Sequence, residues 1–343
     1  MTPIYNQLLI PFLTAMAVAI TMGGSGTAPA FSASYGANVI RKSIIPGLFG
    51  IMVFVGAFIA GKKTAGTMGS GILPSEFMDF TVVSIALFSI AVTMLISNIS
   101  GIPQSTSQAA VLALAAPALY FGRLDTHNLF VEIIPAWFIL PIISYFLSFF
   151  AGKYIYQPMR RRGLTIQRAQ NENKRHIWDI VLVIMALYVS FAIGSNNVAN
   201  AAGPLYTMTI NELHIRESDH IVILMLATLV VAPCFGIGAS LFGHKILKNT
   251  GKEIILFGKF EAVIIAFISG SLLLLASVVK GIPTSLVQVN VAAILGIGVA
   301  KMGHKNIFRK TQVKRFFTMW MIAPVISFLL SLLLIFLADK ANL

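Results

Sequence analysis

Apolar runs of roughly membrane-spanning length recur from one end of the chain to the other. Hydrophobic residues make up 57% of the sequence and charged residues only 11%, whereas soluble domains carry about 25% charged residues. In a bilayer, long apolar runs satisfy their own backbone polar groups by forming helices, and a membrane barrel would instead show short alternating segments. The sequence therefore predicts an all-α polytopic membrane protein with about 10–12 hydrophobic segments. The clearest runs are 8–22, 44–60, 80–99, 109–121, 129–150, 177–193, 221–243, 254–279, 289–300 and 316–338.

Charge and the rarer residue types narrow the class further. A net charge of +13 could suggest nucleic acid, but membrane proteins accumulate Lys and Arg on the cytoplasmic face, so no nucleic-acid partner is expected. Cys234 is the single cysteine, and we expect it to pack in an apolar run. The six histidines are scattered and no nucleotide-binding loop motif occurs, so we expect no metal, no cofactor and no enzymatic activity. No Lys or Arg precedes Arg41, so a cleavable signal peptide is not expected.

A polar stretch interrupts one apolar run. Residues 194–197 read Gly-Ser-Asn-Asn, directly after the run 177–193. Irregular backbone at membrane depth survives only where protein or a cavity surrounds it, and such cavities hold the cargo of transporters. We therefore predict a broken helix at this point, with a binding site beside it.

The sequence also contains an internal repeat. Gly101-Ile102-Pro103-x-Ser105-x-x-Gln108 matches residues 281–288 at five positions, and the Gly-Ser pair at 194–195 matches an earlier one at 24–25. Matched Gly- or Pro-interrupted segments in two halves point to a transporter binding site. We predict a first transmembrane repeat (1–152), a basic cytoplasmic linker (153–176) and a second, inverted transmembrane repeat (177–343). Each repeat contains a broken helix and a re-entrant hairpin.

The distribution of Lys and Arg supports inverted halves. If the short segments around each Gly-Ile-Pro are re-entrant, each half crosses the membrane an odd number of times. With the linker inside, 18 of the 25 Lys and Arg lie inside and 5 outside, as the positive-inside rule requires. Both termini are then predicted to lie outside. The loops at 41–42, 244–252 and 301–315 fall inside, and those at 61–63, 122–128 and 211–220 fall outside.

The breaks offer the chemistry of an anion site. A helix broken at mid-membrane exposes backbone N–H groups and the positive end of its dipole, which suit an anion. Hydroxyl and amide side chains cluster at the same places. The alternative is that small residues only allow close helix packing. The predicted substrate-binding residues are Ser25, Gly26, Thr27, Ser105, Thr106, Ser107, Ser195, Asn196, Asn197, Thr284 and Ser285.

Two ionisable residues stand inside an apolar run. Glu261 and Lys259 are functional candidates because charges at membrane depth are costly. Glu261 is therefore the candidate for carrying a coupling proton. The alternative is that both residues lie at the cytoplasmic boundary, with the lysine stem reaching out to water.

These motifs resemble those of the inorganic phosphate transporter (PiT) family, above all its bacterial sulfate permease branch. The hallmarks of the family are a duplicated Gly-x-Asn-Asp-x-Ala-Asn motif and a duplicated Gly-Leu-Pro-x-Ser-Thr-Thr-His motif. Residues 194–200 match the first, residues 101–108 and 281–288 match the second, and the resemblance covers essentially the whole chain. It implies an inverted-repeat fold, a central anion site and secondary transport.

The departures from the family pattern bear on the substrate. Asn197 stands where the family has Asp, residues 24–27 have neither Asn nor Asp, and Gln108 and Gln288 replace the histidines. Since the aspartates help to bind sodium in the phosphate carriers, their loss puts sodium coupling in doubt. Hydrogen phosphate keeps an O–H that can donate to a carboxylate, whereas sulfate has no proton at neutral pH and would be repelled. A site without a carboxylate therefore favours sulfate.

We expect a secondary transporter that imports an inorganic oxyanion, sulfate first and thiosulfate second, by proton symport. The alternatives are a phosphate transporter coupled to sodium or protons, and an anion channel. The expected partners are the oxyanion, the coupling ion and the lipid of a bacterial inner membrane, and a homodimer is compatible with the sequence.

Overall fold

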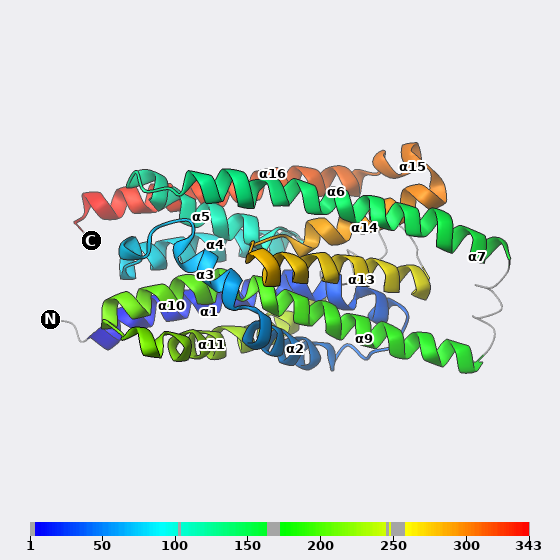
Figure 1. Cartoon of the computed structure of the whole chain (residues 1–343), viewed down its shortest axis with the longest axis horizontal. Coiled ribbons are helices and arrows are strands. Elements are labelled where there is room, and N and C mark those ends of the chain that lie inside the picture. Colours follow the sequence, from blue (N-terminus) through cyan, green and yellow to red (C-terminus); the bar gives the residue numbers. More distant parts are fainter. Residues whose placement is uncertain (1–3, 102–103, 163–171, 245–246, 248–257, 343) are drawn as a thin grey trace.

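Helices aligned along one axis make up the computed structural model of the chain (Figure 1). The structure describes residues 4–101, 104–162, 172–244, 247 and 258–342. Among these residues, seven helices are long and apolar enough to cross a membrane, a bent pair would make eight if it forms one span, and two apolar helices are shorter. The all-α polytopic class is thereby confirmed. Ile102 and Pro103 of the first Gly-Ile-Pro, the linker residues 163–171 and most of the expected loop 244–252 lie outside the described residues.

The first half of the chain ends in a long helix that reaches the far end of the bundle. An unbroken series of helical segments, α6, η3 and α7, runs through the start of the expected linker as far as Arg161, so that part of the linker is helical. The elements are α1 (Ile4–Gly36), α2 (Ile45–Ala60), α3 (Lys62–Ser70), η1 (Ser75–Phe77), α4 (Phe80–Ser100), α5 (Thr106–Tyr120), η2 (Asn128–Ile133), α6 (Ile134–Phe150), η3 (Ala151–Tyr156) and α7 (Gln157–Arg161).

The second half repeats the order of a long helix, a span, a hairpin of apolar helices and a final span. Its first described helix begins at Glu172, so it includes the last five residues of the expected linker. The elements are α9 (Glu172–Asn197), α10 (Ala199–Leu213), η4 (Glu217–Asp219), α11 (His220–Leu241), α13 (Lys259–Leu275), η5 (Ala276–Lys280), α14 (Leu286–Met302), α15 (His304–Phe308) and α16 (Thr311–Lys340).

The helix α1 corrects the expectation of a break at residues 23–29, because it continues unbroken through that stretch. The Ser25 and Thr27 hydroxyls donate to carbonyls of their own helix, at 3.0 and 2.7 Å. A Cβ on Gly23 would overlap the carbonyl oxygen of Phe235 in α11. The small residues therefore allow close helix packing, and this packing stabilises a helix that its own sequence favours only weakly.

The predicted break at 194–197 is also much smaller than expected. Only Val198 separates α9 from α10, and its backbone is itself right-handed helical, with φ −60° and ψ −34°. Gly194 serves packing, since a Cβ there would overlap the Val53 carbonyl of α2. The sharp bend lies elsewhere, at Gly61, where α2 and α3 meet at 77°. Lys62 and Lys63 therefore belong to this bend and not to an outer loop.

The two Gly-Ile-Pro stretches each join two apolar helices. α4 ends at Gly101 and η5 at Gly281, with φ of +69° and +66°, a left-handed conformation that glycine adopts without strain. Figure 1 shows the hairpin of α4 and α5 towards the end with the termini, and the hairpin of α13 and α14 towards the opposite end. The tips of the two hairpins thus approach each other from opposite directions.

Each hairpin packs against the final span of the other half. α5 packs on α16, and α14 packs on α6. The contacts match in detail, because Ser327 of α16 donates to the Ala109 carbonyl at 2.9 Å and Ser144 of α6 donates to the Val289 carbonyl at 2.8 Å. The long helices also pack across the two halves. α1 and α2 of the first half lie against α11 and α9 of the second half, respectively. The two halves are therefore interleaved.

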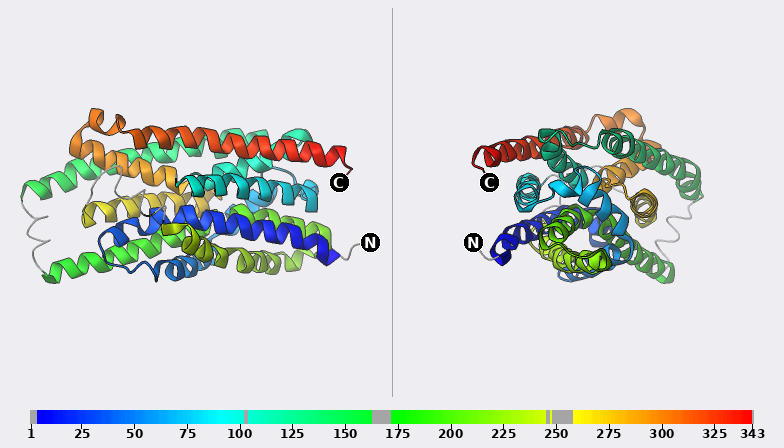
Figure 2. Two further views of the ribbon diagram at one scale, coloured as in Figure 1. Left: turned by 180° about the vertical axis from the view of Figure 1, so that it is seen from behind. Right: turned by 60° about the vertical axis from the view of Figure 1, so that its left-hand side comes forward.

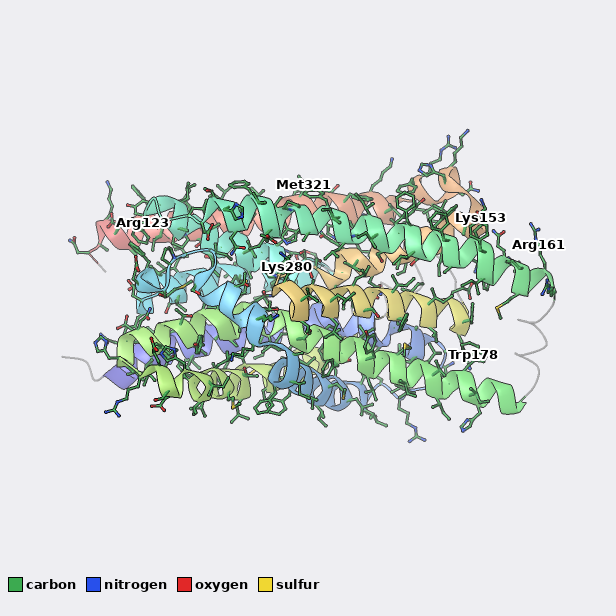
Figure 3. All side chains as sticks on the ribbon, in the orientation of Figure 1. Arg123, Lys153, Arg161, Trp178, Lys280 and Met321 are labelled. Carbon is green, nitrogen blue, oxygen red and sulfur yellow. The ribbon has the colours of Figure 1, made fainter. Side chains whose placement is uncertain are left out.

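Charged side chains lie towards both ends of the bundle, and apolar side chains are exposed between them. Both chain termini lie at one end, and α7 and α15 lie at the other (Figures 1 and 2). Lys153 and Arg161 lie towards the α7 end, and Arg123 lies near the termini (Figure 3). Between the ends, large apolar side chains such as Met321 and Phe138 are 69% and 60% exposed, as expected where a bundle faces lipid.

Candidate functional site

The hairpin tips meet in the interior, where each begins a new helix. Ser105 and Ser285 cap α5 and α14, each accepting the N–H of the glutamine three residues on, at 3.3 and 3.2 Å. Such caps leave the other first-turn N–H groups of the two helices without an intrahelical partner. Gln108 and Gln288 exchange two amide hydrogen bonds, of 3.2 and 2.8 Å, so the two tips are tied directly together.

Asn196, at the end of α9, holds the second tip. Its Nδ2 donates to Ser277 Oγ at 2.8 Å and to the Ile282 carbonyl at 3.0 Å. Its Oδ1 accepts the Thr284 N–H at 3.1 Å and the Ser107 hydroxyl at 3.3 Å. A carbonyl can only accept and an N–H can only donate, so the orientation of this amide is fixed. All of its hydrogen-bonding groups are used to shape the tip.

Asn197 and Asn200 contact the first tip, and the amide oxygen of each has no hydrogen-bond partner. Asn197 Nδ2 donates to Thr106 Oγ1 at 3.1 Å, and Asn200 Nδ2 donates to Ser107 Oγ at 3.2 Å. The Oδ1 atoms of both asparagines and the hydroxyl of Thr284 are buried without a hydrogen-bond partner. Buried polar atoms without partners are rare in native proteins, so three of them between the two tips mark this polar cluster as a place for a ligand.

The remaining predicted residues are buried, but their side chains make no hydrogen bond to this cluster among the described residues. Ser25, Thr27 and Ser195 each donate to a carbonyl of their own helix. Gly26 faces apolar side chains, with Phe49 Cζ 3.2 Å from the place of a Cβ. The structure thus brings together Thr106, Ser107, Asn196, Asn197 and Thr284 around the capped tips. Among the described residues, the Ser25, Thr27 and Ser195 hydroxyls make no hydrogen bond to the side chains of this group, although Ser195 directly precedes Asn196 in the chain.

Several residues of this region were not predicted as part of the site. Asn98 donates to the Thr21 carbonyl at 2.7 Å, which fixes its buried Oδ1 as an unpartnered acceptor. Gln104 accepts from Ser97 and leaves its Nε2 unpartnered. Ser97 precedes Ser277 by 180 residues, the offset of the repeated Gly-Ile-Pro. That extended repeat was the signal that could have identified both serines.

The cluster is polar but not acidic. Among the described residues, no Asp or Glu hydrogen-bonds to any member of it. Glu261, the candidate proton carrier, lies at the other end of the hairpin, roughly 30 Å along α13 and η5 from Gly281 at 1.5 Å per residue. There it accepts the Gly258 N–H at 2.6 Å and pairs with Lys301 at 2.6 Å.

Helices long enough to cross a membrane, packed around buried polar groups without hydrogen-bond partners, are typical of a membrane transporter. The chain belongs to the phosphate transporter family, whose model matches residues 22–331. It is 31% identical to "Sulfate permease CysP" of Bacillus subtilis (strain 168), over 97% of this chain and 89% of that protein. It is 24% identical to "Putative phosphate permease PYRAB14010" of Pyrococcus abyssi (strain GE5 / Orsay), over 94% and 96%. A solved structure titled "The sodium-dependent phosphate transporter" covers 98% of this chain and 99% of its own, with a TM-score of 0.83 at 19% identity.

Proposed function

We propose that this member of the phosphate transporter family is a secondary active importer of sulfate, with thiosulfate as a further substrate. The observation that carries the proposal is the absence of a carboxylate from the hydrogen-bond partners of the described cluster, with Asn197 at its centre. Sulfate can only accept hydrogen bonds at neutral pH and is repelled by a carboxylate. Hydrogen phosphate carries an O–H that a carboxylate would accept. A site built from amides, hydroxyls and N–H groups therefore suits sulfate.

The cluster offers donors that could turn towards an oxyanion. The Thr284 hydroxyl has no partner, and the Thr106 hydroxyl and the Asn197 amide bond only each other. Hydroxyls rotate and an amide can flip where its partner is a hydroxyl, so both could be redirected by a ligand. The first turns of α5 and α14 would add backbone N–H groups and the positive ends of two helix dipoles.

The relatives support an oxyanion and leave two substrates to be compared. Similarity to the sulfate permease spans nearly the whole chain, and similarity to the phosphate permease is weaker but equally extensive. Phosphate transport is therefore the second candidate. The lack of an acidic partner at the cluster is the specific reason for ranking it below sulfate.

The coupling ion is the second part of the proposal. A proton carried by Glu261 was expected, but that residue is remote from the cluster and bound to Lys301. The buried amide oxygens of Asn98, Asn197 and Asn200 are neutral acceptors without partners, and hard cations take oxygen ligands. Sodium is therefore a competing candidate, which the relation to a transporter titled as sodium-dependent also favours.

Alternating access would follow from two inverted repeats, at 1–152 and 177–343, joined by the basic linker 153–176. The interleaved packing of hairpins and final spans supports this proposal. Opposite rocking of the two hairpins would open the cluster to one side at a time. We place the protein in a bacterial inner membrane with the basic α7 end inside and both termini outside. A homodimer is compatible with this arrangement.

Uptake of radiolabelled sulfate into cells that lack their own sulfate carriers tests the proposal. We expect saturable uptake that collapses with the ion gradient, and replacement of external sodium by choline then distinguishes sodium from proton coupling. Ohmic anion currents would indicate a channel. Phosphate uptake that excess sulfate leaves untouched would reject sulfate as the substrate.

A further inference from the structure

The short helix α3 is polar although it forms part of a candidate membrane span. It follows the 77° bend after α2, and the two helices together form one candidate span. Its exposed positions are mostly polar or small, whereas other spans expose Ile, Leu and Phe. Ionisable side chains at membrane depth face water or other protein, not lipid. The exposed residues of α3 are Lys62, Lys63, Gly66 and Ser70, with Thr67 partly exposed.

The end of η5 adds a third lysine beside this helix. Lys280 lies near the middle of the long axis of the bundle (Figure 3), and its side chain is 62% exposed. Its Nζ is 3.5 Å from Glu132 Oε2, and the Nζ of Lys63 donates to the Val279 carbonyl at 3.3 Å. Three lysines and one glutamate therefore leave a surplus of positive charge near the middle of the bundle.

The lysines stand next to the tip that Asn196 holds. The place of a Cβ on Gly281 is 2.8 Å from the backbone carbonyl of Lys63, so the start of α3 lies directly against the turn. Lys62 also lines a cavity of about 120 Å³ that reaches Gly194 and Val198 at the α9–α10 junction. At its other end α3 leads to η1 and α4, whose start lies at the end of the bundle with the termini (Figure 1).

We propose that Lys62, Lys63 and Lys280 line a water-filled vestibule that binds divalent oxyanions weakly and passes them to the polar cluster. These three residues and the exposed face of α3 form the lysine vestibule. The identity of its anion rests on the proposed function. Positive charge in a cleft with low-dielectric walls raises the local concentration of an anion and its rate of entry, which gives a transporter of scarce oxyanions a lower apparent KM.

Cysteine labelling tests the vestibule independently of transport. The single native cysteine, Cys234, is 2% exposed, so Cys234→Ala provides a clean background. A Cβ on Gly66 has nothing within 4 Å, so Gly66→Cys should fit without strain. Ile139→Cys is the control, because Ile139 is 52% exposed on the lipid-facing side of α6, two residues after Trp137, which bonds the Pro283 carbonyl of the tip.

We expect Gly66→Cys to react with thiosulfonate reagents more than tenfold faster than Ile139→Cys, and with an anionic reagent faster than with a cationic one. Adding Lys62→Gln and Lys280→Gln should remove the preference for the anionic reagent. Equal reaction at both positions, or no charge preference at Gly66→Cys, would overturn the proposal. Ser70→Cys gives a second reporter on the same face should Gly66→Cys not be produced.

Uptake supplies the functional test. In Lys62→Gln and Lys280→Gln the apparent KM of the transported oxyanion should rise about two- to tenfold with Vmax unchanged, and the rise should shrink at high ionic strength. Lys340→Gln, at the last turn of α16, should leave KM unchanged. An unchanged KM in both Lys62→Gln and Lys280→Gln would overturn the role in delivery. The labelling experiment does not measure transport, so it tests the vestibule even if the protein carries no sulfate.

Discussion

Asn196 and Asn197 are adjacent and chemically identical, but the structure gives them different tasks. Replacing Asn196 by Ala removes four hydrogen bonds, and it takes the side-chain partner from the part-buried Ile282 carbonyl and the buried Thr284 N–H. Each such group costs about 1–3 kcal/mol, so Asn196→Ala should lose about 2–6 kcal/mol of stability. Asn197→Ala removes one bond, to a hydroxyl that can rotate, and should lose only about 0.5–1.5 kcal/mol.

Thermal unfolding of the purified variants in detergent, together with uptake, distinguishes these tasks. Asn196→Ala should have a clearly lower unfolding midpoint and little transport. Asn197→Ala should unfold close to the wild-type temperature and should show a raised apparent KM for sulfate. Equal stability of the two variants would refute the assignment of Asn196 as the residue that shapes the tip. A wild-type KM in Asn197→Ala would remove Asn197 from the substrate site.

Two further pairs of variants test the local chemistry. Ser105→Ala removes the cap of α5, so it should cost about 1 kcal/mol of stability and raise the apparent KM. Ser195→Ala loses only a hydrogen bond within its own helix, so its effects on stability and KM should be small. A larger KM change in Ser195→Ala than in Ser105→Ala would contradict this order. Glu261→Gln removes the carboxylate from an ion pair with Lys301 whose side chains are 2% and 14% exposed and should cost about 3–5 kcal/mol. Changing Lys301→Met as well should restore most of that stability, and a double variant as unstable as the single one would argue against an ion pair as the reason.

The hairpins were predictable because their signals are local. A left-handed turn requires glycine at 101 and 281, and a serine four residues later caps the next helix, so the repeated motif encodes both the end and the start of a helix. The hydrophobic runs likewise identified most spans. Both signals depend only on the residues of each segment and on the bilayer around it.

The helix breaks could not be predicted in the same way. Gly, Ser and Asn near positions 24 and 194 are poor helix formers, but their small size lets neighbouring helices pack closely at Gly23 and Gly194, and this packing keeps the helices continuous. Whether such a helix breaks or continues therefore depends on helices far away in the sequence, and only the folded structure shows the outcome. The pairing of Gln108 with Gln288 is also a contact between halves that a single segment cannot reveal.

The bend at Gly61 was missed for a related reason. Gly-Lys-Lys after an apolar run is typical of a span that ends at the membrane surface, and nothing local indicates that the lysines lie against the Gly281 turn of the other half. Their position follows from the contact of Lys63 with Gly281, more than two hundred residues away. Long-range contacts of this kind accompany the bend at Gly61 and underlie the proposed vestibule.

The central claim is that a site without a carboxylate at position 197 selects sulfate over phosphate. The most direct measurement is the ratio of sulfate to phosphate uptake in the wild type and in Asn197→Asp, at equal expression and fixed pH. Two unit charges 4 Å apart interact by about 4 kcal/mol at an effective dielectric constant of 20, so a carboxylate beside the sulfate dianion should lower its uptake far more than tenfold. We predict a high ratio in the wild type that falls sharply in Asn197→Asp. A wild type that prefers phosphate, or a ratio that the substitution leaves unchanged, would contradict the claim.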